Sequence, residues 1–411
     1  MPITIGLPLD LPDVRVLATQ VLQDATLLIE VESPLGTAQC HCCGREIDRF
    51  HGFDRPIRLR HLPVFGREVL IEIRPQRYRC PSCEGGPTST QRCAWYEPNR
   101  PHTRAFEQAV LKRLVHSMVA DIHRQCRVGV KAVEGIIHHP VASAVDWRAF
   151  TALDTLGIDE VALLEGHGDY VAVIWARDAE GHNPVLAVLP DRLQATVQAF
   201  LESIPAPLKA TVTRVCIDRW DGYASAVAAA LPKAQIVVDR FHVAVQYRAA
   251  FDDLRQAECQ RLNATRPPER AVPTAELRPL LRREWGSLNH DQQGRVVELF
   301  ELTPALASAY VLRTVLTAIF DHSPDRTTAQ TRLQRWTEPV KASGLSCFDR
   351  FLNTLDNWRE GILNYFEGGH TSGFVEGLNN KLKLLKRRCF GLDDPVELFR
   401  RLWLDLEGPR L

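Results

Sequence analysis

Hydrophobic and polar positions alternate with two different periods along this chain. Residues 103–138, 191–204 and 220–231 show the 3.6-residue period of amphipathic helices. The region 252–360 is helix-rich and charged, carries seven prolines and contains no strand-like run. Short runs rich in β-branched and aromatic residues predict strands at 14–20, 26–32, 68–74, 157–164, 170–176, 184–189, 211–217 and 235–238.

Acidic residues stand in or directly after two of these strands. Asp159 lies within the strand 157–164, and Asp218 directly follows the strand 211–217. A buried carboxylate is costly unless something pairs with it. Because a strand that follows a helical crossover should lie parallel to and near the first strand, we expect Asp218 beside Asp159. With Glu376 on a late helix, these carboxylates would suit a two-metal phosphoryl-transfer site.

The pattern alone leaves alternatives open for each acid. Glu160 competes with Asp159, although consecutive strand residues point to opposite faces, and Asp221 competes with Asp218. Asp218 could also be a helix N-cap. Glu376 by itself would be an ordinary surface acid of a helix.

Four of the eleven cysteines form two CxxC turns. Cys40 and Cys43 make the first turn, and Cys80 and Cys83 make the second, 37 positions further on. Each turn presents two thiolates to one tetrahedral ion, which predicts a zinc site. The pattern does not exclude other ligands nearby, namely Cys42, His41, His51 and His61.

The segment 103–138 suits a helix-turn-helix. A short helix near 119–125, a tight link at 126–129 and a second helix at 130–137 follow one another. The second helix could enter a major groove with Lys131 near its start. Helix pairs with short turns are also common in ordinary protein cores.

A basic helix is predicted near the C-terminus. Phe374, Leu378, Leu382 and Leu385 recur as one apolar stripe. Lys383 stands seven residues, two helical turns, after the candidate acid at position 376, so the two share a face. We expect contacts to DNA phosphates from Lys383, Lys386 and Arg387, although a charge run is more often a solvated face.

Overall composition adds two constraints. The chain has 411 residues, 45% of them hydrophobic, which predicts two or three units with real cores. Its 50 basic and 50 acidic residues cancel, but residues 40–113 hold 14 Lys or Arg against 8 Asp or Glu. Neither a secretion signal nor a membrane-spanning run is evident. We therefore expect a cytoplasmic protein, with cysteines as metal ligands or core residues.

Taken together, these residues resemble the DDE transposases of bacterial insertion sequences, most closely the ISL-three family. The resemblance covers nearly the whole chain. It rests on the double CxxC module, the helix-turn-helix, and the motifs LGIDE, VCIDRWDGY, LPKAQIVVDRFHV and SGFVEGLNNKLKLLKRR.

The resemblance implies an α/β fold in which an RNase H-like mixed sheet is interrupted by an all-helical insertion. The expected domains are a β-rich zinc-binding module at 1–95, a helix-turn-helix domain at 96–150, a catalytic domain at 151–251 and 361–411, and the insertion at 252–360.

The resemblance also implies roles for particular residues. Asp159, Asp218 and Glu376 match the family's acidic triad, which would hold two Mg²⁺ or Mn²⁺ ions, whose preferred protein ligands are carboxylate oxygens. Asp239 and His242 match a D-x-x-H signature of related transposases. For His242 we favour a structural interpretation, that of a core histidine hydrogen-bonded to Asp239.

The function implied is DNA transposition. Such a protein binds the terminal inverted repeats of an insertion sequence, cleaves the strands and transfers them into target DNA. Two chains would meet on the two ends as a homodimer or larger assembly, at the bacterial nucleoid. Two alternatives are a catalytically inert, transposon-derived regulator that only binds DNA, and an RNase H-like nuclease that cuts without joining.

Overall fold

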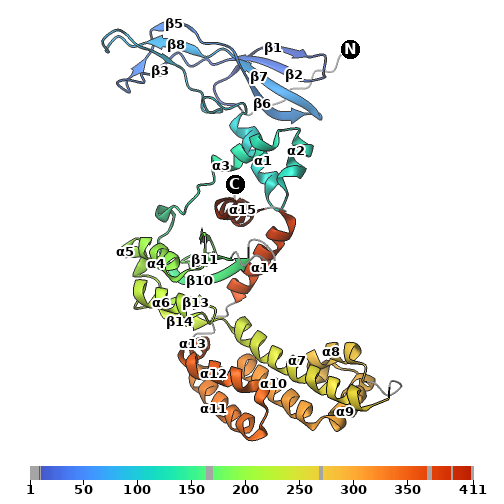
Figure 1. The fold of residues 1–411 in the computed structure, drawn as a ribbon. Helices are drawn as coiled ribbons and strands as arrows, with labels where there is room; N and C mark the ends of the chain where they lie inside the picture. The colour runs from blue at the N-terminus through green and yellow to red at the C-terminus, as the bar shows by residue number, and fades with distance from the viewer. Residues whose placement is uncertain are drawn as a thin grey trace. The chain divides into compact units, whose positions relative to one another are not determined.

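A computed structural model describes residues 9, 11–162, 170–267, 272–367, 373–389 and 392–408 (Figure 1). It divides into two compact units. The first unit is Met1–Val141 with Leu404–Leu411, and the second is Ala142–Trp403.

The first unit begins with a four-stranded sheet in the order β1-β2-β7-β6. Alternate residues of β7, Val69, Ile71 and Ile73, are almost fully buried and pack with Leu59 and Trp95. This period of two produces one buried face, as expected for a half-buried sheet. The strands are β1 (Arg15–Val21), β2 (Leu27–Glu32), β6 (Ile57–Val64) and β7 (Arg67–Ile73).

Two smaller sheets carry the CxxC turns. A two-stranded sheet pairs β3 with β4, and a three-stranded antiparallel sheet has the order β5-β8-β9. Their strands are β3 (Ala38–Gln39), β4 (Glu46–Ile47), β5 (Phe50–Phe53), β8 (Gln76–Arg79) and β9 (Thr88–Thr90).

Three helices follow in the first unit: α1 (Arg104–Leu114), α2 (Val119–Cys126) and α3 (Val130–His138). Each helix contributes fully buried side chains, among them Leu114, Ile122 and Val133. The link between α2 and α3 turns at Arg127, which adopts a left-handed conformation with φ 51°. A short turn between two amphipathic helices was expected here from the sequence.

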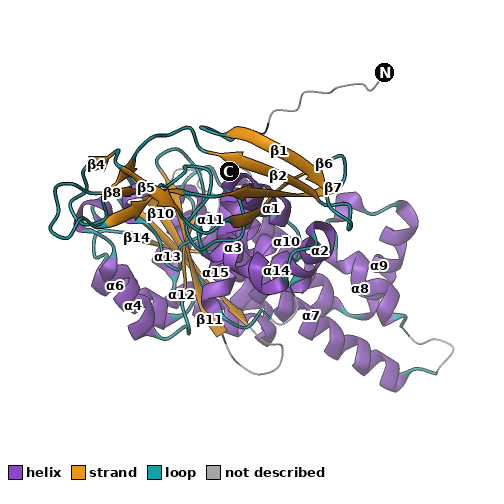
Figure 2. Ribbon diagram, turned by 90° about the horizontal axis from the view of Figure 1, so that it is seen from above, coloured by secondary structure: helices purple, strands orange, loops and turns teal. Residues whose placement is uncertain are grey.

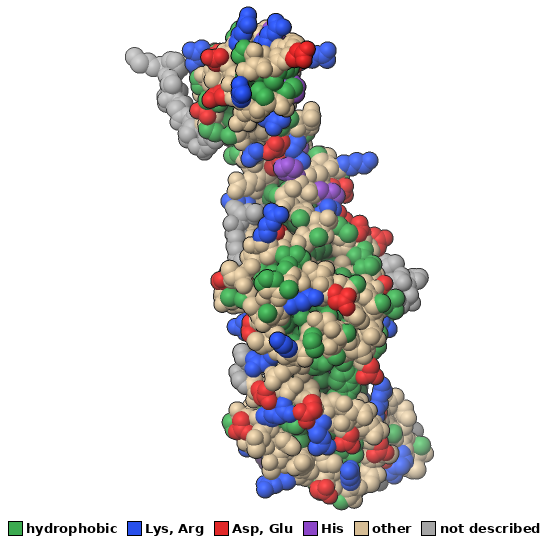
Figure 3. All heavy atoms as spheres, turned by 90° about the vertical axis from the view of Figure 1, so that its left-hand side faces the viewer, with side chains coloured by type: hydrophobic (Ala, Val, Ile, Leu, Met, Phe, Trp, Pro, Cys, Tyr) green, Lys and Arg blue, Asp and Glu red, His purple; other side chains and the backbone are tan. Residues whose placement is uncertain are grey.

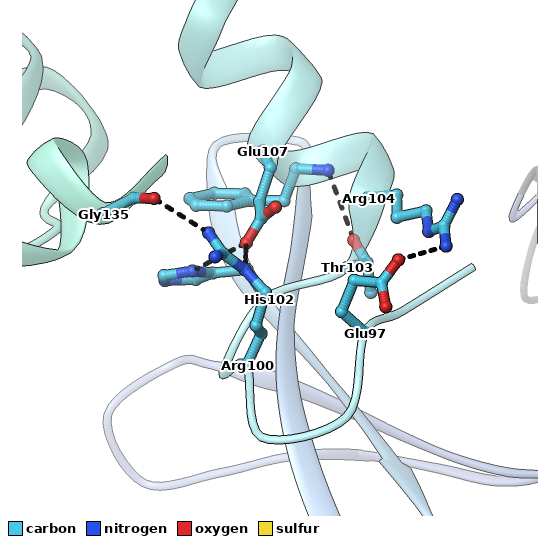
Figure 4. Close-up of polar contacts among 8 residues, drawn as sticks. Glu97, Arg100, His102, Thr103, Arg104, Glu107 and Gly135 are labelled. Atoms are coloured by element: carbon cyan, nitrogen blue, oxygen red, sulfur yellow. Dashed lines mark hydrogen bonds and ion pairs between the residues drawn. The ribbon is translucent and has the colours of Figure 1, made fainter. Parts of the chain in front are cut away.

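A buried ionic contact holds α3 against α1 (Figure 4). Arg100 Nε donates to Glu107 Oε1 of α1 at 2.7 Å, and its NH2 donates to the carbonyl of Gly135 in α3 at 3.2 Å. Burial raises the pKa of Glu107, but hydrogen bonds from His102 and Arg100 outweigh it and hold the pKa below its ordinary value.

The second unit is organised on a five-stranded sheet in the order β12-β11-β10-β13-β14. Strand β11 runs antiparallel to its neighbours β12 and β10, whereas β13 and β14 run parallel to β10. The strands are β10 (Leu153–Ala162), β11 (Tyr170–Asp178), β12 (Val185–Val188), β13 (Arg214–Ile217) and β14 (Gln235–Val238).

Helices α4 (Gln194–Ser203) and α6 (Asp221–Ala230) pack side by side on this sheet, with the short α5 (Ala206–Lys209) between them in sequence (Figures 1 and 2). Their apolar residues Val197, Leu201 and Tyr223 share one core with Ile158 and Ile217 of the sheet. Crossover helices between parallel strands must cover the sheet in this way.

The helical region that directly follows β14, from α7 to α13, forms one body at the β14 edge of the sheet (Figure 1). Asn364 Nδ2 donates to the carbonyl of Ile236 at 2.8 Å, and a Cβ at Gly361 would lie only 2.8 Å from Val238 Cγ2. The helices are α7 (Arg240–Thr265), α8 (Thr274–Arg282), α9 (His290–Leu302), α10 (Pro304–His322), α11 (Arg326–Ser343), α12 (Asp349–Asn357) and α13 (Arg359–Asn364). Short 3₁₀ turns lie among them at Trp285–Ser287 and Ser346–Phe348. Another 3₁₀ turn, Trp147–Ala149, precedes β10.

Two boundaries differ from those expected from the sequence. Helix α7 runs without a break across residue 252, so the helical region begins directly after β14. Residues Leu404–Leu411 group with the first unit, because buried Asp405 accepts a hydrogen bond from the backbone N–H of His116 at 3.0 Å.

On the face drawn in Figure 3, basic and acidic side chains are interspersed.

The last two helices are α14 (Gly373–Arg388) and α15 (Pro395–Glu407). Leu378, Leu382 and Leu385 of α14 are buried, in agreement with the expected apolar stripe. Lys386 donates to the carbonyl of Ala162, which places α14 beside the end of β10. Within the described parts of the chain, no helix combines the length and apolar character needed to cross a membrane.

The contact in Figure 4 generates a first prediction. Replacing Arg100 with Ala leaves Glu107 buried without its cation, which should destabilise the packing of α1 and α3 by roughly 3 kcal/mol. Amide hydrogen exchange in both helices should therefore become about 100-fold faster at pH 7. Because the pKa of Glu107 is lowered, this stabilisation is present above the unfolded pKa near 4.5 and is lost as the pH falls below it.

The matched control is Arg104→Ala. Arg104 pairs with Glu97 at the surface, where such pairs contribute less than ~1 kcal/mol. Equal effects of the two substitutions on exchange would contradict the assignment.

Candidate functional site

The two CxxC turns meet in one cluster of sulfur atoms. Cys40 Sγ lies 3.9 Å from Cys83 Sγ, and Cys43 Sγ lies 3.8 Å from Cys80 Sγ. All four atoms lie within 4.8 Å of one another. Four thiolates at ~2.3 Å from a tetrahedral zinc ion would be separated by about 3.8 Å, so the geometry fits zinc.

The backbone of these turns favours thiolates. Hydrogen bonds from the backbone N–H groups of Cys43 and Cys42 lower the pKa of Cys40 to about 6. Gly44, at φ 68°, allows the first turn to close with a hydrogen bond from its N–H to the Cys40 carbonyl at 2.9 Å.

The other potential zinc ligands lie elsewhere. The Cys42 side chain is exposed and outside the sulfur cluster. His61 is buried with Nδ1 2.9 Å from Thr103 Oγ1, and His41 Nδ1 lies 2.9 Å from Ser89 Oγ. His51 is exposed and likewise outside the cluster.

In the second unit, the register of three parallel strands aligns three aspartates. Ile158 of β10 pairs with Ile217 of β13, which pairs with Val238 of β14. Asp159, Asp218 and Asp239 each follow one of these residues directly. Neighbouring strands lie about 4.8 Å apart, so the three acids form a row, here called the carboxylate row, toward the carboxyl ends of the strands.

This row is buried enough to disfavour three negative charges. Asp159 is 7% exposed and Asp239 is 3% exposed. Burial, assisted by Asp239 and Glu160, raises the pKa of Asp159 to about 6, although Lys383 opposes the shift. Burial, with repulsion from Glu160 and Asp159, likewise raises the pKa of Asp218 to about 6.

Asp218 offers a free ligand atom. Among the described residues, its buried Oδ1 has no hydrogen-bond partner. It is not the N-cap of α6, because Trp220 occupies that position, and the competing Asp221 is exposed. An unpaired buried carboxylate oxygen beside other carboxylates suits a hard divalent cation.

Asp239 and His242 come from the junction of β14 and α7. Asp239 is the N-cap of α7, and its Oδ1 accepts from the Phe241 N–H at 2.9 Å. His242 Nε2 lies 3.8 Å from Asp159 Oδ1 and 3.9 Å from Asp239 Oδ2, with 30% of the side chain exposed. The interpretation of His242 as a core histidine hydrogen-bonded to Asp239 is therefore wrong, because the ring faces two carboxylates beyond hydrogen-bond distance.

Arg192 is a site residue that the sequence pattern did not indicate. Its NH1 donates to Glu160 Oε2 at 2.6 Å, which removes Glu160 from competition with Asp159. Its guanidinium lies 4.5 Å from the Tyr170 ring centre and 5.6 Å from that of Trp220. No periodicity or spacing signals this contact, because Arg192 stands in a loop, 32 positions from its carboxylate partner.

Helix α14 brings its basic residues to the same edge. Lys383 Nζ lies 5.8 Å from the ring centre of Phe241, next to His242, and its charge acts on Asp159. Position 376 lies two turns earlier on α14, but the Glu376 side chain lies outside the described part of the structure. Arg387 is exposed, whereas Lys386 ties α14 to the carbonyl of Ala162.

Two family models match this chain. A family model described as a transposase, for DDE transposases of the ISL-three type, matches residues 156–402. A second model, described as the zinc-finger of the transposases of IS204, IS1001, IS1096 and IS1165, matches residues 36–83 and includes all four clustered cysteines.

Similar full-length proteins are transposases as well. The transposase for insertion sequence element IS1001 of Bordetella parapertussis is 29% identical over 378 residues, 92% of this chain and 91% of that protein. Transposases for IS1557 from two Mycobacterium tuberculosis strains, CDC 1551 / Oshkosh and H37Rv, are 26% identical over 397 residues, 90% of this chain and 86% of theirs. A solved structure, the Drosophila P element transposase strand transfer complex, has a TM-score of 0.39 and 10% identity, covering 76% of this chain and 94% of that one.

The fold and the family models together define a DNA-transposition protein with an N-terminal zinc ribbon. The chain belongs to the ISL-three family of DDE transposases.

The sulfur cluster predicts one zinc ion per chain. Its binding free energy would be folding free energy, roughly 10–16 kcal/mol in small zinc modules. We expect the Cys80→Ser/Cys83→Ser double variant to lose the zinc and the fold of the β3–β9 region. Cys42 lies outside the cluster, so Cys42→Ser should retain both the zinc and the fold. Elemental analysis of the freshly purified proteins measures their zinc content. A wild-type protein without zinc would refute the site.

The carboxylate row predicts a pH-dependent stability. A pKa of Asp159 raised from 3.8 to about 6 corresponds to roughly 3 kcal/mol of stability that is present below pH 3.8 and lost as the pH rises through 6. Without added divalent ions, Asp159→Asn should therefore melt at a higher temperature than wild type at pH 7.5. At pH 4 the two proteins should melt at about the same temperature. Added Mg²⁺ should raise the melting temperature of wild type at pH 7.5 but not that of the variant; an unstabilised variant would contradict the buried charge.

Proposed function

We propose that this protein binds the terminal inverted repeats of an insertion sequence and catalyses metal-dependent strand cleavage and strand transfer. The carboxylate row carries the proposal. Two of its members, Asp159 and Asp218, are the acids that the family resemblance assigns to catalysis, and the strand register aligns them on neighbouring strands.

The sheet supports an RNase H-like catalytic domain. Three antiparallel strands followed by two parallel ones, in the order β12-β11-β10-β13-β14, place β10 and β13, the first and fourth of these strands along the chain, side by side. The proposed organisation is a zinc module at 1–95, a DNA-binding helix-turn-helix at 96–150, and a catalytic domain built on the five-stranded sheet and α14, interrupted by the helical region that begins with α7.

The proposed metal ligands are Asp159, Asp218 and Glu376, holding two Mg²⁺ or Mn²⁺ ions. The unpaired Oδ1 of Asp218 and the raised pKa values of both aspartates fit a site that is completed by cations. When bound, such ions activate a water or 3′-hydroxyl and stabilise the leaving oxygen of a phosphodiester. Asp239 and His242 would position the row from its β14 side, through the N-cap of α7.

Basic residues supply the proposed DNA contacts. Lys131 is exposed in the first turn of α3, the helix that would enter the major groove. Lys383 stands beside the carboxylate row, where it would bind a phosphate next to the scissile bond, and Arg387 extends this basic edge. Lys386 would contribute by holding α14 against β10, because its ammonium group bonds the Ala162 carbonyl.

The proposed partners are double-stranded DNA, both the repeats and the target, and a second copy of the chain that holds the other end. The proposed place of action is the bacterial nucleoid in the cytoplasm. The alternative function is a regulator that binds DNA but has lost catalysis. The intact carboxylate row favours the enzyme over the regulator.

Substitution of the acids by amides tests this proposal. Asp159→Asn, Asp218→Asn and Glu376→Gln should each reduce Mg²⁺-dependent cleavage of a labelled inverted-repeat duplex to background, because each removes a metal-binding charge while keeping side-chain size. Binding of the same duplex in a gel shift should persist, because it is assigned to residues 1–150.

Asp221→Asn is the matched control, since this acid is exposed at the start of α6 and should leave cleavage largely intact. A wild-type protein that binds the duplex and never cuts it with Mg²⁺ or Mn²⁺ would favour the regulator. Activity in Glu376→Gln would show that the third acid is another residue.

A further inference from the structure

The helical region contains a cleft that the proposed catalytic site does not use. It has a volume of about 800 Å³ and lies between α7, α10 and the segment that follows α8. Pockets of roughly 300–1,000 Å³ accommodate ligands of small-molecule size. The cleft is therefore too small for a duplex and large enough for a nucleotide.

A buried arginine lines this cleft. Arg313 is 7% exposed, and its guanidinium carbon lies 4.7 Å and 4.8 Å from the ring centres of Phe251 and Tyr310. Its NH1 donates to the carbonyl of Leu281 at 2.5 Å. Among the described residues, no carboxylate lies within ion-pair distance of it. Because a buried charge without a counter-ion is costly, an anion in the cleft would offset this cost.

The surroundings of Arg313 are basic as well. Arg248 is exposed at the cleft wall, and no hydrogen bond or ion pair engages its side chain in the described part of the chain. The lining carboxylates Asp252 and Asp321 are already paired with arginines. Four arginines line the cleft against three acids: Arg248, Arg282, Arg283 and Arg313 against Asp252, Glu284 and Asp321.

An aromatic ring stands among these cations. Trp285 lines the cleft and is 38% exposed, which is unusual for so large an apolar side chain. In proteins that bind unpaired nucleic acid, an exposed aromatic ring stacks on a base while neighbouring cations contact the phosphate.

We propose that this cleft binds a nucleoside phosphate, with the phosphate at Arg248 and Arg313 and the base against Trp285. The source we favour is an unpaired segment of DNA, which rests on the proposed function; a free nucleotide shares the same chemistry. Helix α7 connects the two sites, since Arg248 is six residues, about 9 Å along the helix axis, beyond His242. A DNA strand at the carboxylate row would thus have a second contact within reach.

Binding of labelled oligonucleotides by the full-length, zinc-loaded protein tests the proposal. We expect Arg248→Gln/Trp285→Ala to bind a single-stranded 12-mer about tenfold more weakly than wild type, with a shallower dependence of affinity on salt. The matched control is Arg335→Gln, because Arg335 is an exposed arginine of α11 outside the cleft, and it should bind like wild type. Fluorescence anisotropy gives the affinities, and hydrogen exchange of α7 confirms that the variants remain folded.

Competition with ATP distinguishes the two sources. Displacement of the 12-mer by ATP at concentrations near its own dissociation constant would assign the cleft to a free nucleotide, whereas displacement only by unlabelled DNA would assign it to a strand. Equal affinity of the double variant and wild type for both probes would overturn the proposal, and so would a wild-type protein that binds neither.

Failure of the proposed function has a different signature. A wild-type protein that neither binds nor cuts the inverted-repeat duplex would refute that function. The cleft would then stand only if ATP binds to wild type and binds about tenfold more weakly to the double variant.

Discussion

The parallel register of β10, β13 and β14 is the constraint on which the carboxylate row depends. Hydrogen bonding along these strands aligns Ile158, Ile217 and Val238, so the acid that follows each one enters the same row. Packing of α4 and α6 on the sheet maintains this register from one side. The row places carboxylates close together where water is largely excluded, so burial and mutual repulsion make their negative charges costly. Bound cations would offset that cost.

The surrounding elements each limit that cost in a different way. Arg192 neutralises Glu160 and so leaves Asp159 as the available acid on β10. The start of α7 stabilises Asp239 through the Phe241 N–H, and Lys383 of α14 brings a positive charge to the same edge. Because the Lys386 side chain bonds the Ala162 carbonyl at the end of β10, the proposed third acid is carried on an element with a defined position beside the row.

The helical region shares a hydrophobic core with the sheet. Residues of β13 and β14, Cys216, Val237 and Val238, belong to the same hydrophobic core as the helices after α7. Gly361 permits the close approach of α13 to β14, since any side chain there would meet Val238. A continuous core of this kind gives α7 a fixed direction from the carboxylate row toward the arginine-lined cleft.

Local pattern determined much of this protein. The strands around Asp159 and Asp218 and the helix of residues 373–388 follow from period and propensity, which act between near neighbours, and the pairing of two CxxC turns follows from the ligand chemistry of zinc. Tertiary structure alone decided which of several nearby groups meet. Strand register brings Asp239 into the row, and the start of α7 turns His242 toward two carboxylates. Arg192 pairs with Glu160, and Arg313 lines a cleft where no described carboxylate pairs with it. These contacts join residues far apart in the chain, and their energies depend on burial and distance, which no sequence period records.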